Sequence, residues 1–439
     1  MKPENRPFVP LVLFFLGCAL ALGLWQLARF PGFASHGDGE ESAAGGLFGH
    51  RDGATPPDRP SAAARVPDLS QAYLEALAEE LSRPGAWENE ALLTFSGQDQ
   101  LEEFVSRAAS FGLGATRPHS QANTIRVSFD SLAQLHDALV ARSGERPEVS
   151  ANFSVGIPGL PAPPEAGGTG EAPFGEDLLP SLGIDVGADR SDWGAGVLVA
   201  VIDSGVSPHP SFREGQITRV DLTDGQGDLH GHGTAMASLV AGSHPGAEGV
   251  APGADILDIR IAGSDGVSDS FLLAEGIHTA MERGAAVINI SMGTPGDAAP
   301  VAAAVAEAVK RGITVVAAVG NDRAGVKIWP AAYPGVISVS GVDAQGNLAY
   351  FSNSGYPTIA APSVGIPSAY QEKGNALLAT GNGTSQATAL VSGAVAAFRA
   401  RGIEAGTALI ENARPGAAGK QEIGAGILFV PGASGSRKP

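Results

Sequence analysis

Hydrophobic and polar positions follow two different patterns along the chain. Between residues 88 and 158, short stretches with period two alternate with helical spacing, and a weak helix is also expected at 69–81. The expected strands are 91–95, 113–117, 124–129 and 149–155, and the expected helices are 99–111 and 132–141. This βαββαβ order is typical of a small α+β domain of the ferredoxin-like type, and it also suits an accessory binding domain.

From residue 179 to 431 the pattern changes to strands of near-continuous apolar residues, alternating with helices. The expected strands are 197–202, 256–261, 286–290, 314–319 and 336–342, with helices at 271–283 and 300–311. Strands that are apolar on both faces are covered on both faces, and their alternation with helices favours parallel pairing. The sequence therefore predicts a doubly wound α/β domain with a mostly parallel sheet, in which ligands bind beyond the carboxyl ends of the strands.

Residues 1–32 form a unit of their own. Lys2 and Arg6 precede residues 8–27, which carry no charge; this length of about 20 residues matches a bilayer core, and the basic end would stay in the cytoplasm. We favour a retained signal anchor; the alternatives are a cleaved signal peptide and a lipoprotein signal ending at Cys18. All three place the remainder outside the cytoplasm, either membrane-anchored (periplasmic or at the cell surface) or secreted.

Composition defines the linking segments and excludes several functions. Residues 33–87 are expected to be a disordered spacer around the helix at 69–81, residues 159–178 a Pro/Gly-rich linker, and residues 432–439 a tail. A net charge of −18 without a basic block argues against a nucleic-acid partner. Because Cys18 is the only cysteine, the folded part contains no disulfide, cysteine nucleophile or thiolate metal site.

Four polar residues lie at strand ends or helix starts of the α/β region. Asp203 ends the first strand and His232 begins a helix, while Asn321 follows the strand at 314–319 and Ser385 connects a tight turn to a buried helix. Each has a commoner explanation when taken alone, such as helix capping for Ser385. Together they supply what acyl transfer requires: a nucleophile, a base, a carboxylate that orients the base, and an amide that receives the oxyanion.

At this point the chain resembles the subtilisin-like serine proteases, the subtilases, over residues 179–430. The resemblance is carried by four motifs in order, which are VIDSG at 201–205, HGT at 232–234, AVGN at 318–321 and GTSQA at 383–387. It implies that His232 is the base for the nucleophile Ser385, oriented by Asp203, and that Asn321 belongs to the oxyanion hole. The order Asp, His, Ser is that of subtilisin and is taken over from the family rather than derived.

The resemblance also implies a substrate groove and a propeptide. Ser291, Met292 and Gly293 match a strand that pairs with an extended peptide, and Val319 and Gly320 match a second substrate-binding segment. The peptide bond at Trp329-Pro330 is expected to be cis. Residues 88–158 have the position and element order of the family's inhibitory propeptide, so cleavage is expected in the linker between residues 158 and 178.

No cofactor is implied by this chemistry. The loop at 242–249 lacks the oxygen-rich composition of the family's calcium loop, so a structural calcium ion is not indicated, and Asp221, Asp224 and Asp228 fit a polar turn better than a cation site. Ala235 and Ala389 replace a histidine and a proline that are common in the family. These two replacements leave the subfamily open without touching the catalytic residues.

The sequence therefore predicts a serine endopeptidase that acts outside the cytoplasm, with polypeptide substrates and its own propeptide-like domain as partners. The alternative is a catalytically silent peptide-binding protein on the same fold, and a maturation protease for one partner is a third interpretation. The segment 322–328 is expected to shape the first substrate pocket, but Asp322, Arg323 and Lys327 mix both charges and indicate no preference.

Overall fold

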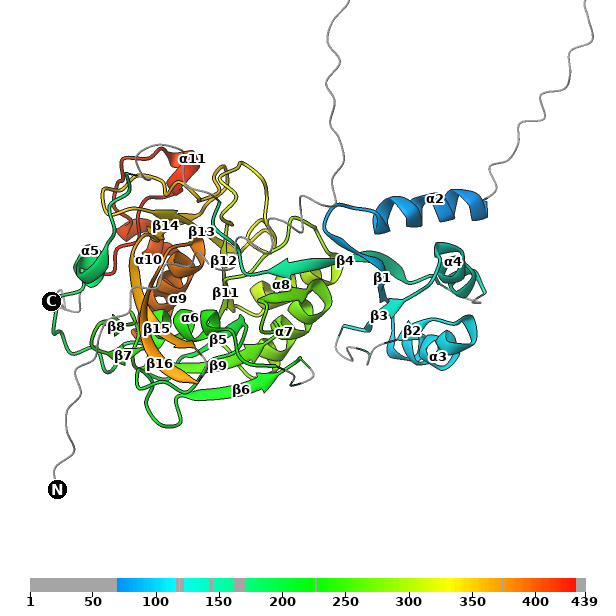
Figure 1. The fold of residues 1–439 in the computed structure, drawn as a ribbon, viewed down its shortest axis with the longest axis horizontal. Coiled ribbons are helices and arrows are strands. Elements are labelled where there is room, and N and C mark those ends of the chain that lie inside the picture. Colours follow the sequence, from blue (N-terminus) through cyan, green and yellow to red (C-terminus); the bar gives the residue numbers. More distant parts are fainter. Residues whose placement is uncertain are drawn as a thin grey trace, which may run out of the picture.

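The computed structural model describes residues 69–431, except 116, 117, 119–121, 142–144, 162–169, 224, 226 and 373. The segment 8–27, the spacer up to residue 68 and the tail 432–439 lie outside the described residues. A small α+β domain lies beside a larger α/β domain (Figure 1). Within the described ranges, no helix is both long and apolar enough to cross a membrane.

The small domain has the element order expected from the sequence. Its elements are α2 (Leu69–Leu81), β1 (Ala86–Thr94), α3 (Gln98–Ala108), η1 (Ala109–Phe111), β2 (Gly114–Ala115), β3 (Thr124–Ser128), α4 (Leu132–Val140) and β4 (Glu148–Gly156). The strands pair antiparallel in the order β4-β1-β3-β2, the neighbour relationship of a ferredoxin-like sheet. Leu93, Ile125 and Leu135 are fully buried between the sheet and its helices, and Leu77 adds α2 to this core.

The larger domain is built on seven parallel strands. Their order across the sheet is β14-β13-β12-β11-β5-β9-β6. The strands are β5 (Leu198–Asp203), β6 (Ile217–Asp221), β9 (Asp255–Arg260), β11 (Val287–Ile290), β12 (Thr314–Ala318), β13 (Ile337–Val342) and β14 (Ile359–Pro362). This sheet confirms the predicted doubly wound α/β architecture.

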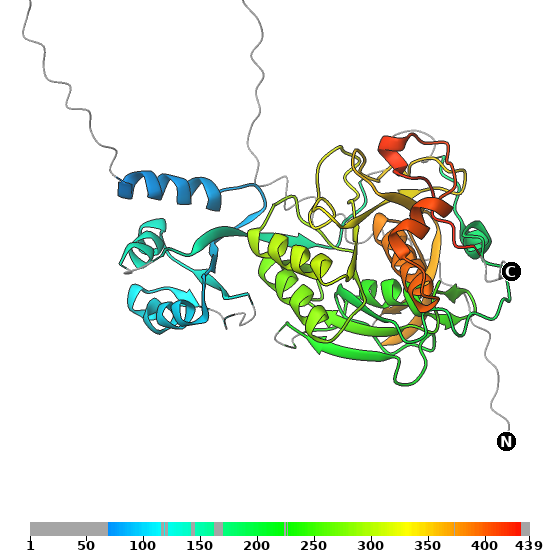
Figure 2. The same cartoon turned by 180° about the vertical axis from the view of Figure 1, so that it is seen from behind.

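Helices cover both faces of the sheet, which explains why its inner strands are mostly apolar on both faces. One face carries α6 (Gly231–Ala241) and α9 (Thr384–Ala400), with α10 (Ala405–Asn412) against α9. The other carries α7 (Ser270–Glu282) and α8 (Ala299–Lys310), seen from behind in Figure 2. Along β5, Val199 and Val201 belong to the first core, while Ala200 and Ile202 belong to the second. Successive side chains of a strand point to opposite faces, so both sets must be apolar.

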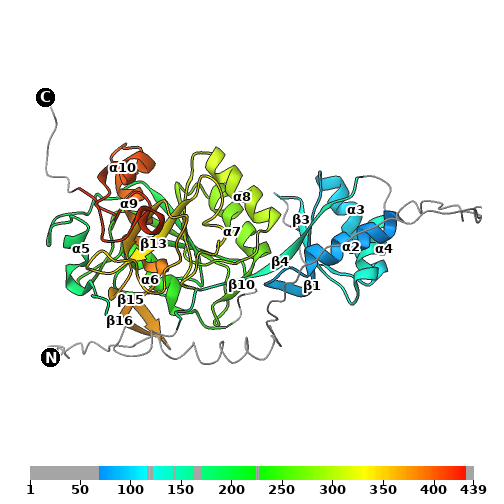
Figure 3. The ribbon, with the colours of Figure 1, turned by 90° about the horizontal axis from the view of Figure 1, so that it is seen from above.

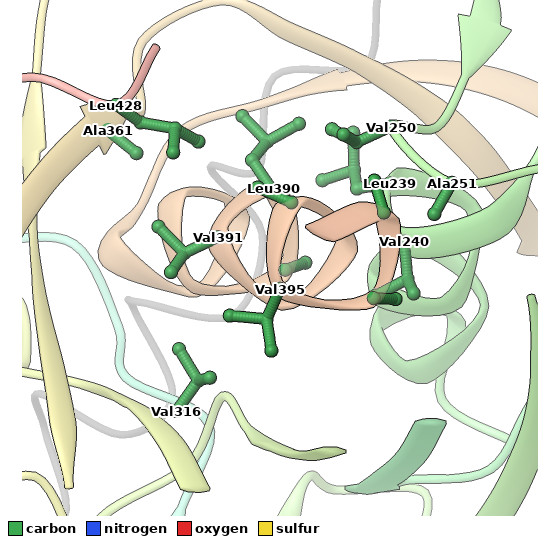
Figure 4. Packing of buried hydrophobic residues seen from close by; sticks show 14 of the residues in the cluster. Leu239, Val240, Val250, Ala251, Val316, Ala361, Leu390, Val391, Val395 and Leu428 are labelled. Atoms are coloured by element: carbon green, nitrogen blue, oxygen red, sulfur yellow. The ribbon is translucent and has the colours of Figure 1, made fainter. Parts of the chain in front are cut away.

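Helix α9 lies at the centre of the first core. Figure 4 shows Leu390, Val391 and Val395 projecting from α9 toward the surrounding elements, with Val240 on α6 and Val316 on β12. All five side chains are fully buried. The small-residue run after residue 385 therefore forms a buried helix, as predicted, and this packing fixes the first turn of α9 in place.

Several short elements were not expected from the sequence. Besides β6 and β14, they are β7 (Ser243–His244), β8 (Ala247–Glu248), β10 (Val267–Asp269), the hairpin of β15 (Ile366–Glu372) and β16 (Asn375–Gly381), η2 (Gly175–Asp177), α5 (Leu178–Ser181) and α11 (Lys420–Ile423). Strand β10 is only three residues long and pairs with β4 of the small domain. A strand that short is held by its partner, so its own hydrophobic pattern carries little signal.

Two further features concern the predicted linker and the cis bond. Phe174 and Leu178 are buried in the core of the larger domain, so the chain is already packed there before the linker's expected end at residue 178. Backbone bonds from Phe174 and Gly175 to Val364 and Gly365 hold this stretch. The peptide bond between Trp329 and Pro330 is cis, as expected.

Candidate active site

The candidate catalytic residues gather at the point where the strand order reverses. The chain places β6 and β9 on one side of β5 and then continues with β11, β12, β13 and β14 on the other. In such sheets, ligands bind in the crevice outside the carboxyl ends of the strands that flank the reversal. Asp203 is the last residue of β5, and Ser291 follows the end of β11.

Asp203 and His232 form a buried hydrogen-bonded pair. The Nδ1 atom of His232 lies 2.9 Å from both carboxylate oxygens of Asp203, and the backbone N–H of Ser204 donates to the same carboxylate at 2.7 Å. Burial alone would raise the pKa of Asp203, but attraction to His232 and the hydrogen bonds from His232 and Ser204 outweigh it and hold that pKa below its ordinary value. Asp203 is therefore ionised at neutral pH and orients the imidazole.

The HGT motif has a structural explanation in the start of α6. His230 is the N-cap, and its Nδ1 accepts a hydrogen bond from the backbone N–H of His232 at 3.3 Å. Burial, and then repulsion by His232, lowers the pKa of His230, which keeps it a neutral acceptor. A Cβ atom on Gly233 would lie 2.5 Å from the carbonyl oxygen of Gly205. Glycine is required there because the helix approaches the turn after Asp203 this closely.

Ser385 lies in the first turn of α9, where the backbone N–H groups have no acceptor within the helix. Its side chain is 3% exposed, and its hydroxyl donates to the carbonyl oxygen of Ser291 at 3.0 Å. The preceding Gly383 has φ 150°, and a Cβ atom on it would lie 3.3 Å from Nδ2 of Asn321. A side chain at position 383 would therefore intrude on the amide that faces this turn.

Asn321 is fixed in one orientation by Thr384. Its Oδ1 accepts hydrogen bonds from the backbone N–H of Thr384 at 3.0 Å and from the hydroxyl of Thr384 at 2.9 Å. Because the oxygen is engaged on that side, the amide nitrogen faces the other way, and Nδ2 donates to the carbonyl oxygen of Pro158 at 3.2 Å. A carbonyl from the end of the small domain is thus held by the residue expected to receive an oxyanion.

The chain that leaves the small domain enters the crevice as an extended strand. Ser154 to Gly156 pair antiparallel with β10, as seen from above in Figure 3. On its other side, Gly156 exchanges two hydrogen bonds with Gly293, each 3.1 Å long. Ile157 then donates to the carbonyl oxygen of Gly266 at 3.1 Å. The segment is held as a substrate strand would be, by backbone pairing on both edges.

The register of this pairing places Pro158 opposite Ser291. In an antiparallel pair, hydrogen-bonded positions recur every second residue, so the pair Gly156–Gly293 is followed by Pro158–Ser291. Proline has no backbone N–H to donate, which leaves the carbonyl oxygen of Ser291 without that bond. The hydroxyl of Ser385 donates to this oxygen instead.

The small domain is also docked on helix α7 by side chains. Arg126 forms an ion pair with Asp269, the N-cap of α7. The hydroxyl of Ser270 accepts from the backbone N–H of Phe153 at 2.7 Å and donates to its carbonyl oxygen at 3.2 Å. The buried ring of Phe153 covers Gly296, where a Cβ atom would lie 2.0 Å from the ring. The interface therefore combines charge, backbone pairing and close apolar packing.

The residues expected to bind substrate lie on two segments with different surroundings. Gly293 pairs with the inserted strand, the carbonyl oxygen of Ser291 accepts from the Ser385 hydroxyl, and Met292 is fully buried. The hydrogen bonds made by Val319 and Gly320 go to their own domain; for example, the carbonyl oxygen of Val319 accepts from Asn353 and Tyr356, and that of Gly320 accepts from the backbone N–H of Asn353. Sequence reasoning missed β10 as the second edge of the groove.

A second buried carboxylate, that of Asp258, lies on strand β9 next to the strand that carries Asp203, and it was not predicted from the sequence. It stands on β9 opposite Val201 and is fully buried; its Oδ2 accepts from the backbone N–H of Val206 at 3.0 Å and from Nε of Arg219 at 2.6 Å. Burial raises the pKa of Asp258, and the opposing charge of Arg219 does not offset it. Asp258 thus supports the turn that follows the catalytic aspartate.

The region considered for a cation is occupied by protein contacts. Asp221 forms an ion pair with Arg260 at 3.2 Å and accepts hydrogen bonds from Thr223, while Asp224 lies outside the described residues. Over the part of the chain that the structure describes, no cluster of three or more His, Cys, Asp or Glu side chains is arranged to hold a metal.

Comparisons with known proteins agree with this geometry. A model described as "Subtilase family" matches residues 194–407. Subtilisin Savinase from Lederbergia lenta is 38% identical over 212 residues, which cover 47% of this chain and 78% of that protein. An alkaline protease from Alkalihalobacillus alcalophilus is also 38% identical over 212 residues, which cover 55% of that protein.

A solved structure supports the fold independently. The crystal structure of fervidolysin from Fervidobacterium pennivorans, described as a keratinolytic enzyme related to subtilisin, matches with a TM-score of 0.66 at 23% identity. The match covers 80% of this chain and 61% of that one. At this level of identity the likeness concerns the fold alone.

Proposed function

The chain belongs to the subtilase family and is a subtilisin-like serine protease, and from this premise we propose that Asp203, His232 and Ser385 are its catalytic triad. His232 takes the proton of Ser385 as the hydroxyl attacks the scissile carbonyl, and later protonates the leaving amine. Asp203 holds the imidazole with Nδ1 protonated and stabilises the imidazolium that forms. Its lowered pKa supports this role because the carboxylate then stays charged at neutral pH.

The proposed oxyanion hole consists of the Asn321 side chain and the backbone N–H of Ser385. Nδ2 of Asn321 is a fixed donor because Thr384 engages its oxygen. The N-terminal end of α9 adds a partial positive charge beside the developing oxyanion. This arrangement requires neither a catalytic metal nor an organic cofactor.

One observation carries the proposal more than any other, and it is the hydrogen bond from Asn321 to the carbonyl oxygen of Pro158 at 3.2 Å. It supports Pro158–Gly159 as the bond that the protease cuts in its own chain, with residues 88–158 acting as an inhibitory propeptide until released. Gly159 is exposed and follows the inserted strand directly. Within the predicted cleavage region between residues 158 and 178, this is therefore the bond that we propose.

We also propose that the protease acts on polypeptides outside the cytoplasm. The support is the charge pattern of the N-terminus, where Lys2 and Arg6 precede the apolar residues 8–27. Retention of that segment would anchor the enzyme in the membrane, and its removal would release the enzyme. Fractionation of expressing cells, followed by sequencing of the enzyme's N-terminus, separates the two.

Labelling with a fluorophosphonate probe tests the catalytic proposal, because only an activated serine reacts with it. The chain should be labelled at Ser385, and His232→Ala should lose the label while remaining folded. Ser392→Ala is a matched control, since Ser392 is another buried serine of α9. A folded chain that binds peptides, is not labelled and does not turn them over would instead be the catalytically silent peptide-binding protein.

A further inference from the structure

Ile328 fills the space between two glycines of the groove. A Cβ atom on Gly293 would lie 2.4 Å from Cγ2 of Ile328, and a Cβ atom on Gly320 would lie 2.8 Å from Cγ1 of the same side chain. Both separations are shorter than any real carbon contact, so the isoleucine lies directly against both backbones. Its side chain is buried at 7% exposure.

These two glycines flank the residue whose carbonyl is held for cleavage. Gly293 exchanges two hydrogen bonds with Gly156, two residues before Pro158. Gly320 immediately precedes Asn321, whose side chain donates to the carbonyl oxygen of Pro158. The space between the two glycine segments is therefore where the side chain before the scissile bond would have to extend, and Ile328 occupies it.

The surroundings of Ile328 hold it in place. Its backbone N–H donates to the hydroxyl of Tyr356 at 2.8 Å, and that hydroxyl donates to the carbonyl oxygen of Val319 at 3.1 Å. Burial raises the pKa of Tyr356 to about 12, which keeps the hydroxyl protonated as a donor. The carbonyl oxygen of Ile328 accepts from the backbone N–H of Ala332 at 3.0 Å.

The neighbouring backbone and the chemistry of the side chain add to this rigidity. Trp329 exchanges two backbone bonds with Thr294, so the segment is tied to the edge of the groove as well. A β-branched side chain on a backbone fixed in this way has few rotamers available. The side chain therefore has little freedom to swing aside for a larger substrate group.

We propose that Ile328 sets the size limit for the residue on the amino side of the cleaved bond. The protease then cleaves after small side chains, namely alanine, glycine and proline, and rejects phenylalanine, tyrosine and leucine. This inference rests on the proposed function, because it names the substrate class of the same site. Pro158, the residue seated in the groove, has a side chain of the permitted size.

Two peptides that differ only in this side chain test the proposal. They carry the chain's own residues 153–160 between a fluorophore and a quencher, with alanine or phenylalanine in place of Pro158, so that both retain the backbone N–H. The enzyme is the full chain after its own processing, with active sites counted by fluorophosphonate labelling. The variants are Ile328→Ala, the milder Ile328→Val and, as a matched control, Val326→Ala, because Val326 is 47% exposed in the same segment.

Both peptides also contain Gly156 and Gly159, so cleavage at the bond after position 158 is quantified by mass spectrometry of the products. At that bond the wild type should cleave the alanine peptide at least about tenfold faster in kcat/KM than the phenylalanine peptide. Ile328→Ala should reduce that ratio by about tenfold or more, Ile328→Val by less, and Val326→Ala should leave it unchanged. A labelled wild type that cleaves both peptides equally, or a labelled Ile328→Ala with an unchanged ratio, would overturn this inference alone. An enzyme that is not labelled and cleaves neither peptide would overturn the proposed function and this inference with it.

Discussion

The hydroxyl of Ser385 donates its hydrogen bond to the carbonyl oxygen of Ser291, at a distance of 3.0 Å. The single proton of the hydroxyl is thus engaged by a backbone acceptor and not by the imidazole of His232. The Gly156–Gly293 pair sets a register in which Pro158 would come opposite Ser291, and proline has no backbone N–H to compete with Ser385 for this oxygen. Pro158 therefore affects the hydrogen bond of Ser385 indirectly, because it leaves the carbonyl oxygen of Ser291 to the Ser385 hydroxyl.

Pro158→Ala should accelerate self-processing. An alanine N–H would donate to the carbonyl oxygen of Ser291 and free the Ser385 hydroxyl for His232. The gain of one hydrogen bond corresponds to about a threefold to tenfold increase in rate. It is measured by following the appearance of chains that begin at Gly159 in freshly folded full-length protein.

Pro161→Ala is the control for this change, since it makes the same replacement three residues later. The carbonyl oxygen of Pro161 accepts from Tyr350 at 3.1 Å, a bond that alanine retains. This variant should be processed at the wild-type rate. Equal acceleration by both variants would mean that chain flexibility, and not the Ser291 carbonyl, controls the rate.

Asn321→Ala should lower kcat by about 10²- to 10³-fold with little change in KM, which is the range for loss of one oxyanion-hole donor in subtilisin. The reason is that Nδ2 of Asn321 is the side-chain donor on the carbonyl oxygen of Pro158. Steady-state kinetics on a peptide substrate separate kcat from KM.

Thr384→Val tests whether the donor must also be oriented. It removes the hydroxyl bond to Oδ1 of Asn321 and leaves the backbone bond from residue 384. The loss in kcat should be clearly smaller than that of Asn321→Ala. An equal loss in kcat in the two variants would mean that the position of the turn at Thr384, and not the amide of Asn321, accounts for the effect.

The two-domain fold could be predicted because the inner strands of the larger sheet are buried on both faces and each long helix is amphipathic or made of small residues. The edge strand β6 is partly exposed and gave no such signal. The carboxyl ends of parallel strands share one edge, so the placement of Asp203 and Asn321 at the same edge of the sheet followed from strand positions alone. The pairing of β4 with β10 could not be predicted, because three residues carry no period of their own.

The size of the first substrate pocket could not be predicted from the sequence either. The charges of segment 322–328 pointed to no preference, and the decisive residue is the apolar Ile328 at its end. Ile328 lies 35 residues after Gly293 and 8 residues after Gly320 in the sequence, and only the fold brings its side chain against both. The Asp258 carboxylate was missed for a similar reason, since its partner Arg219 lies on the unexpected strand β6.

Asp258→Asn should change how stability depends on pH. Burial raises the pKa of Asp258 in the folded state above its unfolded value of about 3.9. The stability that protonated Asp258 contributes is fully present below that unfolded value and is lost as pH rises through the folded pKa. Asparagine is neutral at every pH, so the variant does not lose this stability. Its free energy of unfolding should therefore rise relative to that of the wild type between pH 3 and 7. The rise is about 1.4 kcal/mol for each pH unit by which the folded-state pKa of Asp258 exceeds the unfolded value.

This comparison is made by urea denaturation in the Ser385→Ala background, so that self-digestion does not interfere. The reference is the Ser385→Ala chain with Asp258 unchanged, measured at each pH. A constant difference in the free energy of unfolding between Asp258→Asn and this reference, or a drift in the opposite direction, would contradict a raised pKa at Asp258.

The central claim is that Ser385 cuts the chain's own Pro158–Gly159 bond, and the N-terminal sequence of the folded protein tests it most directly. Wild-type chains should acquire a new N-terminus at Gly159, while Ser385→Ala chains, folded and purified in the same way, should keep that bond intact. Removal of the nucleophile should slow the cut by about a millionfold, the loss known for the serine of subtilisin. A Ser385→Ala chain that is cut at the same bond at the wild-type rate, or a wild-type chain cut before residue 88, would contradict the account.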